Sequence, residues 1–222
     1  MIKKLLCYLL LVFSLYNYFL FFEWYLGDQQ IIIEDALFLS LSSSLPLFLM
    51  IFLIHIFYYP KQHSERANVI TFPPIIMLLS ANLAFTISTL NMYHFQVYNV
   101  PRFFDFLRST ELGIIFFFLS FIILFSALKE FKRNNEDPIP TTPSTLIISR
   151  GIYGYSRNPM YLGLLFFQIG LGMLLSMTHI IFFSFFTYLI YNYYVIKPEE
   201  LYLSKKFGKA YLDYKLQVRK WL

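Results

Sequence analysis

The chain has 222 residues, a formal net charge of +5, and a composition that is 58% hydrophobic and only 14% charged. Soluble domains are about a quarter charged, so this composition argues against a soluble globular protein. Five stretches contain no Asp, Glu, Lys or Arg: residues 5–22, 36–60, 67–101, 112–128 and 158–196. Because a membrane-spanning helix needs roughly 17–25 mostly apolar residues, each stretch is long enough to cross a bilayer. The sequence therefore predicts a polytopic membrane protein.

The predicted fold is all-α: a membrane bundle of about six transmembrane helices followed by a C-terminal amphipathic helix at the membrane interface. The six predicted spans are residues 5–24, 36–59, 69–92, 111–129, 159–177 and 179–196. Residues 1–130 are predicted to be a four-helix scaffold, and residues 131–222 to complete the same domain and carry the functional site. The scaffold spans lack charged residues in their interior, which argues against an ion pump, a proton-coupled transporter or a gated channel.

The distribution of basic residues predicts the orientation. Six spans place 16 of the 18 Lys and Arg residues on one side, and only Arg102 and Arg108 on the other. Loops on the cytoplasmic side carry the excess of Lys and Arg, so both termini are predicted to be cytoplasmic, in a membrane of prokaryotic inner-membrane type. The only cysteine, Cys7, allows neither an intrachain disulfide nor a cysteine-based metal site, and no metal is predicted.

A hydrophilic loop separates the fourth and fifth spans. Residues 131–144 are charged and proline-rich, and they are predicted to be irregular and exposed. Asn158 followed by Pro159 predicts the start of the fifth helix, with Asn158 as the N-cap and proline at the first helical position. A helix N-terminus beside Arg157 is suited to hold an anionic group.

The C-terminal segment has the pattern of an interfacial helix. Pro198 is predicted to end the sixth span, and Glu199 and Glu200 to open a new helix, since acidic residues favour the N-terminal end of the helix dipole. Beyond them, apolar residues recur at helical spacing between basic ones, as in helices that lie on a membrane surface. Gly208 interrupts this pattern and predicts a bend or a close approach.

Three separated motifs resemble those of a known family. They are Arg157-Asn-Pro-Met-Tyr-Leu-Gly163, Pro198-Glu-Glu200 and Phe207-Gly-x-x-Tyr211-x-x-Tyr214-x-x-x-Val218-Arg219. The chain is similar here to the isoprenylcysteine carboxyl methyltransferase and phospholipid N-methyltransferase group of integral membrane enzymes, especially its small bacterial members. The resemblance covers about residues 140–222, and the rest of the chain matches only in being apolar helices.

The resemblance implies methyl transfer from S-adenosylmethionine to a lipophilic acceptor, a carboxylate such as a prenylcysteine-like group or a lipid amine. The acceptor is expected to enter from the bilayer, with no nucleic acid and no obligate protein partner involved. Carried over by position, the expected catalytic residues are Arg157, Asn158 and Glu200. The expected cofactor-binding residues are Tyr153, Arg157, Asn158, Pro159, Tyr161, Gly163, Glu199, Glu200, Tyr211 and Tyr214.

Each residue type suits a part of the chemistry. The helix N-terminus with Arg157 is expected to hold a carboxylate, and Glu199 or Glu200 to hold amino or ribose groups. The aromatic faces of Tyr153 and Tyr161 would stabilise a sulfonium or pack on adenine. Many relatives have His where this chain has Asn158, and an amide cannot act as a base near neutral pH. This departure bears more on the isoprenylcysteine substrate than on cofactor binding.

Structural alternatives stay open for the same residues. Arg157 has the position of a positive-inside anchor, the two glutamates that of helix-start acids, and the tyrosines that of interface-belt aromatics. Two other functions also fit: a membrane reductase using NADPH, because sterol reductases share a related C-terminal architecture, and a non-catalytic membrane scaffold. Only the co-occurrence of the motif residues at the family's spacing favours a functional role for them, and binding of S-adenosylhomocysteine or of NADPH would separate the methyltransferase from the reductase.

Overall fold

A computed structural model describes residues 2–27, 33–60 and 66–222, and it is helical throughout its regular elements. Lys61, one of the 16 basic residues predicted to lie on the cytoplasmic side, is outside the described residues. The elements, in chain order, are α1 (Ile2–Leu26), α2 (Ile33–Tyr58), α3 (Pro73–Leu90), η1 (Asn91–Phe95), η2 (Arg102–Arg108), α4 (Thr110–Arg133), η3 (Gly151–Gly154), α5 (Pro159–Leu174), α6 (Thr178–Ile190), η4 (Tyr191–Ile196), α7 (Lys197–Phe207) and α8 (Lys209–Gln217).

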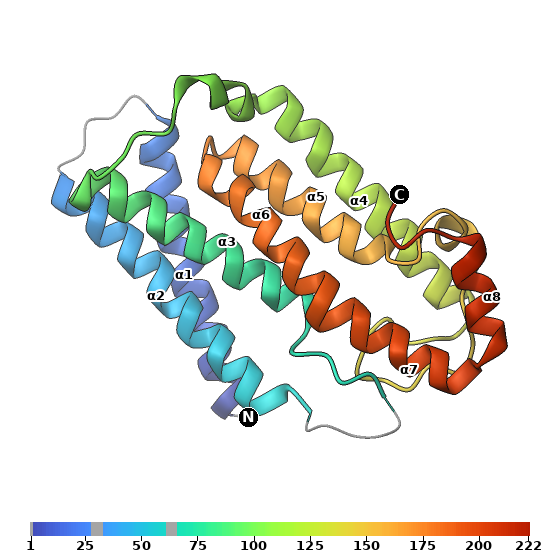
Figure 1. Cartoon of the computed structure of the whole chain (residues 1–222). Helices are drawn as coiled ribbons and strands as arrows, with labels where there is room; N and C mark the ends of the chain where they lie inside the picture. The colour runs from blue at the N-terminus through green and yellow to red at the C-terminus, as the bar shows by residue number, and fades with distance from the viewer. Residues whose placement is uncertain (1, 28–32, 61–65) are drawn as a thin grey trace.

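Helices α1 to α6 alternate in direction along the bundle (Figure 1). Helix α1 packs along α2, α3 packs against α6, and α4 lies along α5. Six alternating helices return the chain to the end where it began, so the N-terminus and the α7–α8 segment lie toward the same end of the bundle (Figure 1). This arrangement agrees with the predicted six-helix bundle.

Among the described residues, five helices are long and apolar enough to cross a membrane: Ile2–Leu26, Ile33–Tyr58, Pro73–Phe95, Thr110–Arg133 and Thr178–Phe207. The predicted fifth span is shorter than expected, because α5 has 16 residues and ends at Leu174. At ~1.5 Å per residue it is about 24 Å long. It runs antiparallel between α4 and α6, so it crosses the bundle as a short helix (Figure 1).

Helix α4 illustrates the apolar outer surface. Ile115, Phe118, Ile122 and Phe125 recur at steps of three and four residues, and each is more than half exposed. In water such a stripe would be unfavourable, whereas hydrocarbon chains solvate it at no such cost. The chain is an integral membrane protein.

The prediction that Pro198 ends the sixth helix is wrong. Helix α6 continues through η4, a stretch of π-helix, into α7, so the helix is unbroken from Thr178 to Phe207. Proline lacks the N–H that would reach the carbonyl four residues earlier. That carbonyl, of Tyr194, instead accepts a hydrogen bond from the Ile70 N–H at 3.2 Å. The segment between α2 and α3 thus satisfies the group that Pro198 leaves unpaired.

The break comes at Gly208 instead. Its φ of +55° lies in the region that favours glycine, and the chain turns there from α7 into α8. The predicted single interfacial helix is therefore two helices. Helix α8 buries Tyr211 and Tyr214, which pack with Val218 and Ile147 and hold the C-terminal segment against the end of the bundle.

Candidate functional site

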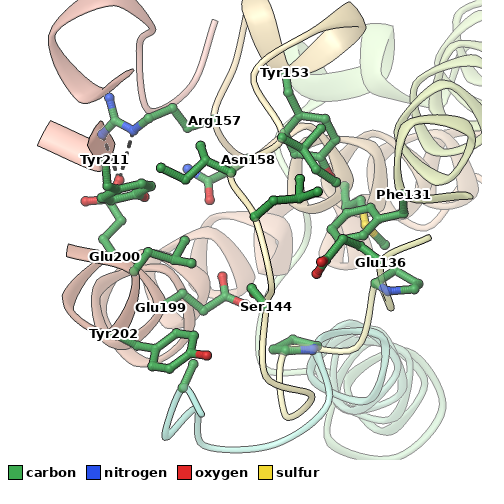
Figure 2. Close-up of a pocket in the computed structure, with 18 of the residues that line it drawn as sticks. Phe131, Glu136, Ser144, Tyr153, Arg157, Asn158, Glu199, Glu200, Tyr202 and Tyr211 are labelled. Carbon is green, nitrogen blue, oxygen red and sulfur yellow. Dashed lines mark hydrogen bonds and ion pairs between the residues drawn. The ribbon is translucent and has the colours of Figure 1, made fainter. Parts of the chain in front are cut away.

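A cavity opens at the end of the bundle where α4 ends and α5 begins (Figure 2). Its empty volume is about 890 Å³ when the space open to solvent is counted. Five parts of the chain enclose it: the segment before α3 at Ala67, the end of α4 with the loop after it, the η3 turn with the start of α5, the helix α7, and α8. Its lining includes Tyr153, Arg157, Asn158, Tyr161, Glu199, Glu200, Tyr211 and Tyr214. Eight of the ten residues expected from the sequence thus gather at one cavity.

Arg157 and Glu200 form an ion pair at the wall of this cavity. The Arg157 Nη2 and Nε atoms lie 2.7 and 3.1 Å from the same oxygen of Glu200, Oε1. Lys215 of α8 approaches the other oxygen, Oε2, at 3.3 Å. The two side chains of the pair are only 9% and 12% exposed, so water screens the interaction weakly. Glu200 is thereby held between α5 and α8.

The remaining donors of this segment bind the C-terminal backbone. Arg157 Nη1 donates to the carbonyls of Lys215, at 3.2 Å, and Val218. Together with the two bonds to Glu200, four of the five guanidinium N–H groups are used. The Arg157 N–H donates to the Arg219 carbonyl, and Asn158 Nδ2 to the Lys220 carbonyl, both at 2.9 Å. Residues 157 and 158 therefore fasten the C-terminal segment across the start of α5.

Asn158 occupies the predicted N-cap position, and Pro159 is the first residue of α5. The Asn158 side chain makes no capping hydrogen bond, however, because its amide nitrogen is directed to Lys220. The first N–H groups of a helix have no partner within the helix. Without a side-chain cap, the N–H groups of Met160 and Tyr161 remain directed at the cavity end of α5, where the helix dipole favours an anion.

Glu199 lies on α7 one residue before Glu200 but has different surroundings (Figure 2). Its Oε1 accepts a hydrogen bond of 2.7 Å from the Tyr161 hydroxyl of α5. In the parts of the chain that the structure describes, Glu199 takes part in no ion pair. It is thus a cavity-facing carboxylate that is held in place by a neutral donor and has no protein cation to balance it.

Three tyrosines add aromatic surface to the cavity. The Tyr214 hydroxyl donates to the Tyr153 carbonyl at 2.7 Å, which ties α8 to the η3 turn. Phe131 contacts the Tyr153 ring edge to face, with ring centroids 5.7 Å apart. Burial raises the pKa of Tyr153, and the nearby Glu199 carboxylate raises it further. Burial also raises the pKa of Tyr211. These phenols therefore stay neutral donors at any physiological pH.

The loop between α4 and η3 is folded over one side of the cavity. The Glu136 carboxylate accepts from the Thr145 N–H at 2.9 Å and from the Thr145 hydroxyl. The Asp137 carboxylate accepts from the Ile139 N–H at 2.9 Å and from the Thr142 hydroxyl at 3.0 Å. Two acidic side chains thus close the loop on itself. The predicted irregular segment is confirmed from Asn134 onward, whereas residues 131–133 form the end of α4.

Comparison with known proteins adds one match. Residues 109–210 match the model of the family described as phospholipid methyltransferase. The matched part, a little under half of the 222 residues, is similar to the phospholipid methyltransferase family. Neither the curated proteins nor the solved structures gave a match.

The phospholipid methyltransferase match does not coincide with the sequence motifs. It begins at residue 109, so it takes in α4, which the motif resemblance left out. It ends at residue 210, just before Tyr211 and Tyr214. The structure nevertheless places both tyrosines at the same cavity as the matched residues, because the turn at Gly208 brings α8 back over α5.

Pro159 and Gly163 do not line the cavity. Pro159 is fully buried and starts α5. A side chain at Gly163 would come within 2.8 Å of Leu124, so this glycine lets α5 approach α4. Both residues position the site through the backbone.

The sequence motifs missed part of the lining, namely Phe131, Glu136, Asp137, Tyr202 and Leu203. Tyr202 and Leu203 follow Glu199 by three and four residues, a spacing that places them on the same face of a helix. If the sequence had been interpreted as one helix that continues through Pro198, this spacing would have predicted Tyr202 and Leu203 at the cavity. Glu136 and Asp137 belong to an irregular loop, and no periodicity in the sequence points to their position.

Proposed function

We propose that this protein transfers a methyl group from S-adenosylmethionine to an amine on a lipophilic acceptor. The observation that carries the proposal is the charge of the cavity. Among the described residues that line it, Arg157 is the one guanidinium, and its charge is paired with Glu200. The other three acidic side chains, Glu136, Asp137 and Glu199, take part in no ion pair within the described parts of the chain. An acidic cavity favours a sulfonium and an ammonium group over a carboxylate acceptor.

The polar and aromatic groups that line the cavity fit the proposed cofactor. The uncapped start of α5 suits its carboxylate, and the acidic loop residues suit its amino and ribose hydroxyl groups. Tyr153 and Tyr211 offer aromatic faces to adenine or to the positive sulfur. When bound, S-adenosylmethionine would supply a methyl group on a positively charged sulfur. A nicotinamide cofactor carries phosphate groups, which require cations. The acidic lining of this cavity has the opposite charge.

The protein residues then divide into two groups by role. Glu199 holds the ammonium group of the acceptor and takes its proton, which frees the nitrogen lone pair for attack on the methyl carbon. Tyr161 positions this carboxylate through its hydrogen bond. Arg157, Asn158 and Glu200, expected from the sequence to be catalytic, act as positioning residues because their polar groups bind one another and the C-terminal segment. The loop and α8 exclude water.

We also propose on which side of which membrane the methyl transfer takes place. With both termini at one end of the bundle, the excess of Lys and Arg favours a cytoplasmic position for that end. The cavity lies at this end, so the methyl transfer would take place at the cytoplasmic face of a prokaryotic inner membrane. S-adenosylmethionine is made in the cytoplasm, which agrees with this orientation.

Membranes that contain the protein test the proposal when they are incubated with S-adenosylmethionine labelled in its methyl group. We expect label in a lipid extract, and we expect it to survive mild alkali, because a methylamine is stable whereas a methyl ester is released as methanol. Titration of the purified protein with S-adenosylhomocysteine and with NADPH provides the second measurement. Saturable binding of NADPH alone would favour the reductase and contradict the methyltransferase.

A further inference from the structure

A polar pocket lies at the end of the bundle opposite to the acidic cavity. It is formed where α3 and η1 end and α6 begins, and its empty volume is about 950 Å³ when the space open to solvent is counted. We call it the α6 pocket, after Thr178 and His179, the first residues of α6, which line it. Helix α6 runs unbroken into α7, so Glu199 of the cavity is near the other end of the same helix (Figure 1). The pocket and the cavity share no lining residue among those described.

A hydrogen-bonded loop forms one wall of the α6 pocket. The Asn91 side chain holds this loop: its Oδ1 accepts from the N–H groups of Val97 and Tyr98 at 3.1 and 3.3 Å, and its Nδ2 donates to the Tyr98 carbonyl at 2.8 Å. The Tyr98 hydroxyl lies 2.6 Å from Nε2 of His179. The loop is thereby fastened to the start of α6, and the two sides of the pocket are held at a fixed separation.

Two hydroxyl groups at this pocket are buried without a hydrogen-bond partner. Ser88 of α3 and Thr178 of α6 both line the pocket and are only 4% and 2% exposed, yet neither side chain bonds to any described residue. In the described parts of the chain, Trp221 Nε1 is the one fully enclosed side-chain polar atom that lacks a partner. The two hydroxyl oxygens therefore keep some exposed surface, and at residues so buried this surface faces the pocket. Buried polar groups are normally hydrogen-bonded, so these oxygens indicate a ligand.

The charge of the α6 pocket favours an anion. Helix α6 begins without a side-chain cap, so its first N–H groups are unpaired at the positive end of the helix dipole. Arg108 adds a guanidinium to the lining. Its ion pair with Asp105, at 3.3 Å, is about half exposed and therefore weak. None of the described residues that line the pocket is acidic.

We propose that the α6 pocket binds a small oxyanion, a carboxylate or phosphate group on a water-soluble molecule. Arg108, the hydroxyls of Ser88 and Thr178, and the first N–H groups of α6 are the donors that such oxygens prefer. The aliphatic lining is limited to Met92 and Val100, so a hydrocarbon chain would find little surface there. This favours a soluble ligand over a lipid. The site goes beyond the proposed methyl transfer and does not depend on it.

Melting temperatures of the purified full-length protein in a neutral detergent test the pocket, because a ligand that binds only the folded state raises them as its concentration rises. The probes, at constant ionic strength, are sodium phosphate, sodium acetate, glucose and dihexanoyl phosphatidylglycerol. Ser88→Ala and Thr178→Val each remove one hydroxyl, and Arg108→Gln removes the charge. Arg102→Gln is the matched control, since Arg102 is an exposed arginine of the same η2 element and does not line the pocket. Anion binding elsewhere on the chain is common to all four variants, so their differences report the pocket.

We expect phosphate and acetate to raise the melting temperature of the unaltered protein and of Arg102→Gln alike, and glucose to have no effect. Each of the three pocket variants should weaken anion binding about tenfold, the loss of one charge-assisted hydrogen bond. Without an anion, Ser88→Ala and Thr178→Val should melt like the unaltered protein, because neither loses a hydrogen bond within the chain. A merely structural role would instead lower both melting temperatures.

Equal anion affinities in the pocket variants and in Arg102→Gln would place the binding elsewhere and overturn the proposal. Glucose that stabilises the protein as strongly as phosphate would overturn the preference for an anion. Dihexanoyl phosphatidylglycerol that binds through Ser88 and Thr178 far more tightly than phosphate would overturn the water-soluble source.

Discussion

The guanidinium of Arg157 and the carboxylate of Glu200, 43 residues apart in the chain, form an ion pair of 2.7 Å at the wall of the cavity. Arg157 also binds the carbonyls of Lys215 and Val218, so one side chain joins the start of α5 to α7 and to the segment after α8. The pair closes the end of the bundle that holds the cavity. The pair therefore stabilises the fold at this end of the bundle, and it affects ligand binding because it keeps the walls of the cavity in place.

Replacing Arg157 by Ala is expected to lower the free energy of unfolding by about 3 kcal/mol, because Glu200 would stay buried beside Lys215 alone. Arg157→Lys should recover only part of this loss, since an ammonium group lacks the planar fork that binds Glu200 and the carbonyls together. Thermal unfolding in detergent measures the effect, with the exposed Arg150→Ala as the control. A melting temperature for Arg157→Ala equal to that of the control, with S-adenosylhomocysteine binding lost, would make Arg157 a direct ligand instead.

The sequence predicted much of this fold from a simple physical signal. The absence of charges over stretches of 17 residues or more placed the ends of helices α1 to α5 to within about four residues, because a charge in hydrocarbon is costly. Two boundaries differ for specific reasons. Helix α5 ends at Leu174, before the predicted boundary, and the helix through Pro198 continues because Ile70, 128 residues earlier, satisfies the Tyr194 carbonyl. A prediction from neighbouring residues alone cannot include a hydrogen-bond donor so far away in the chain.

Eight of the ten motif residues line the cavity, but the side chains with which they pair could not be predicted from the sequence. Arg157 was assigned to a ligand carboxylate because it precedes a helix N-terminus. Which of two adjacent glutamates would take up its charge depends on the rotation of α7 against α5, and that rotation is a tertiary property. It directs Glu200 to Arg157 and leaves Glu199 with Tyr161.

Glu199→Gln is expected to lower the rate of methyl transfer to an amine by about 10²-fold or more, the usual contribution of a general base. S-adenosylhomocysteine affinity should change little, because the amide keeps the shape and the hydrogen bond from Tyr161. Tyr161→Phe, which keeps the carboxylate but removes its orienting donor, should cost less than Glu199→Gln. Initial rates with labelled cofactor and calorimetry measure the two quantities. Loss of affinity in parallel with the rate would place Glu199 on the cofactor.

Gly170→Val is expected to destabilise the contact between α4 and α5 by about 1–3 kcal/mol, the usual cost of overpacking a tight interface. A Cβ atom at Gly170 would lie 2.8 Å from the backbone nitrogen of Phe117, and a backbone atom cannot move aside as a side chain can. Gly154→Val is the matched control, since a Cβ there would meet its nearest neighbour, the Ser149 carbonyl oxygen, at 3.5 Å. Equal melting temperatures for the two variants would contradict the close packing.

The hydrogen bond from Tyr214 to the Tyr153 carbonyl is expected to make the stability of the fold decrease at alkaline pH. Burial raises the pKa of Tyr214 above its usual value of 10.0. A group whose folded pKa is raised contributes stability that is complete below the unfolded pKa and falls as pH rises above it. Melting temperatures measured from pH 7 to 11 should therefore decline above about pH 10, and less steeply in Tyr214→Phe. The exposed Tyr155→Phe should keep the full decline, and an equal slope in all three proteins would refute the assignment.

The orientation can be tested with single cysteines because Cys7, the only native one, can be replaced by Ser. Asn99, before η2, and Lys209, at the start of α8, are both exposed. The segment between α3 and α4 and the α7–α8 segment lie at opposite ends of the bundle (Figure 1). A membrane-impermeant maleimide applied to intact bacterial cells should label Asn99→Cys, and it should label Lys209→Cys only after the cells are permeabilised. The reason is the excess of Lys and Arg at the end that carries α8. Labelling of Lys209→Cys in intact cells would place the cavity on the outer face, where cytoplasmic S-adenosylmethionine could not reach it.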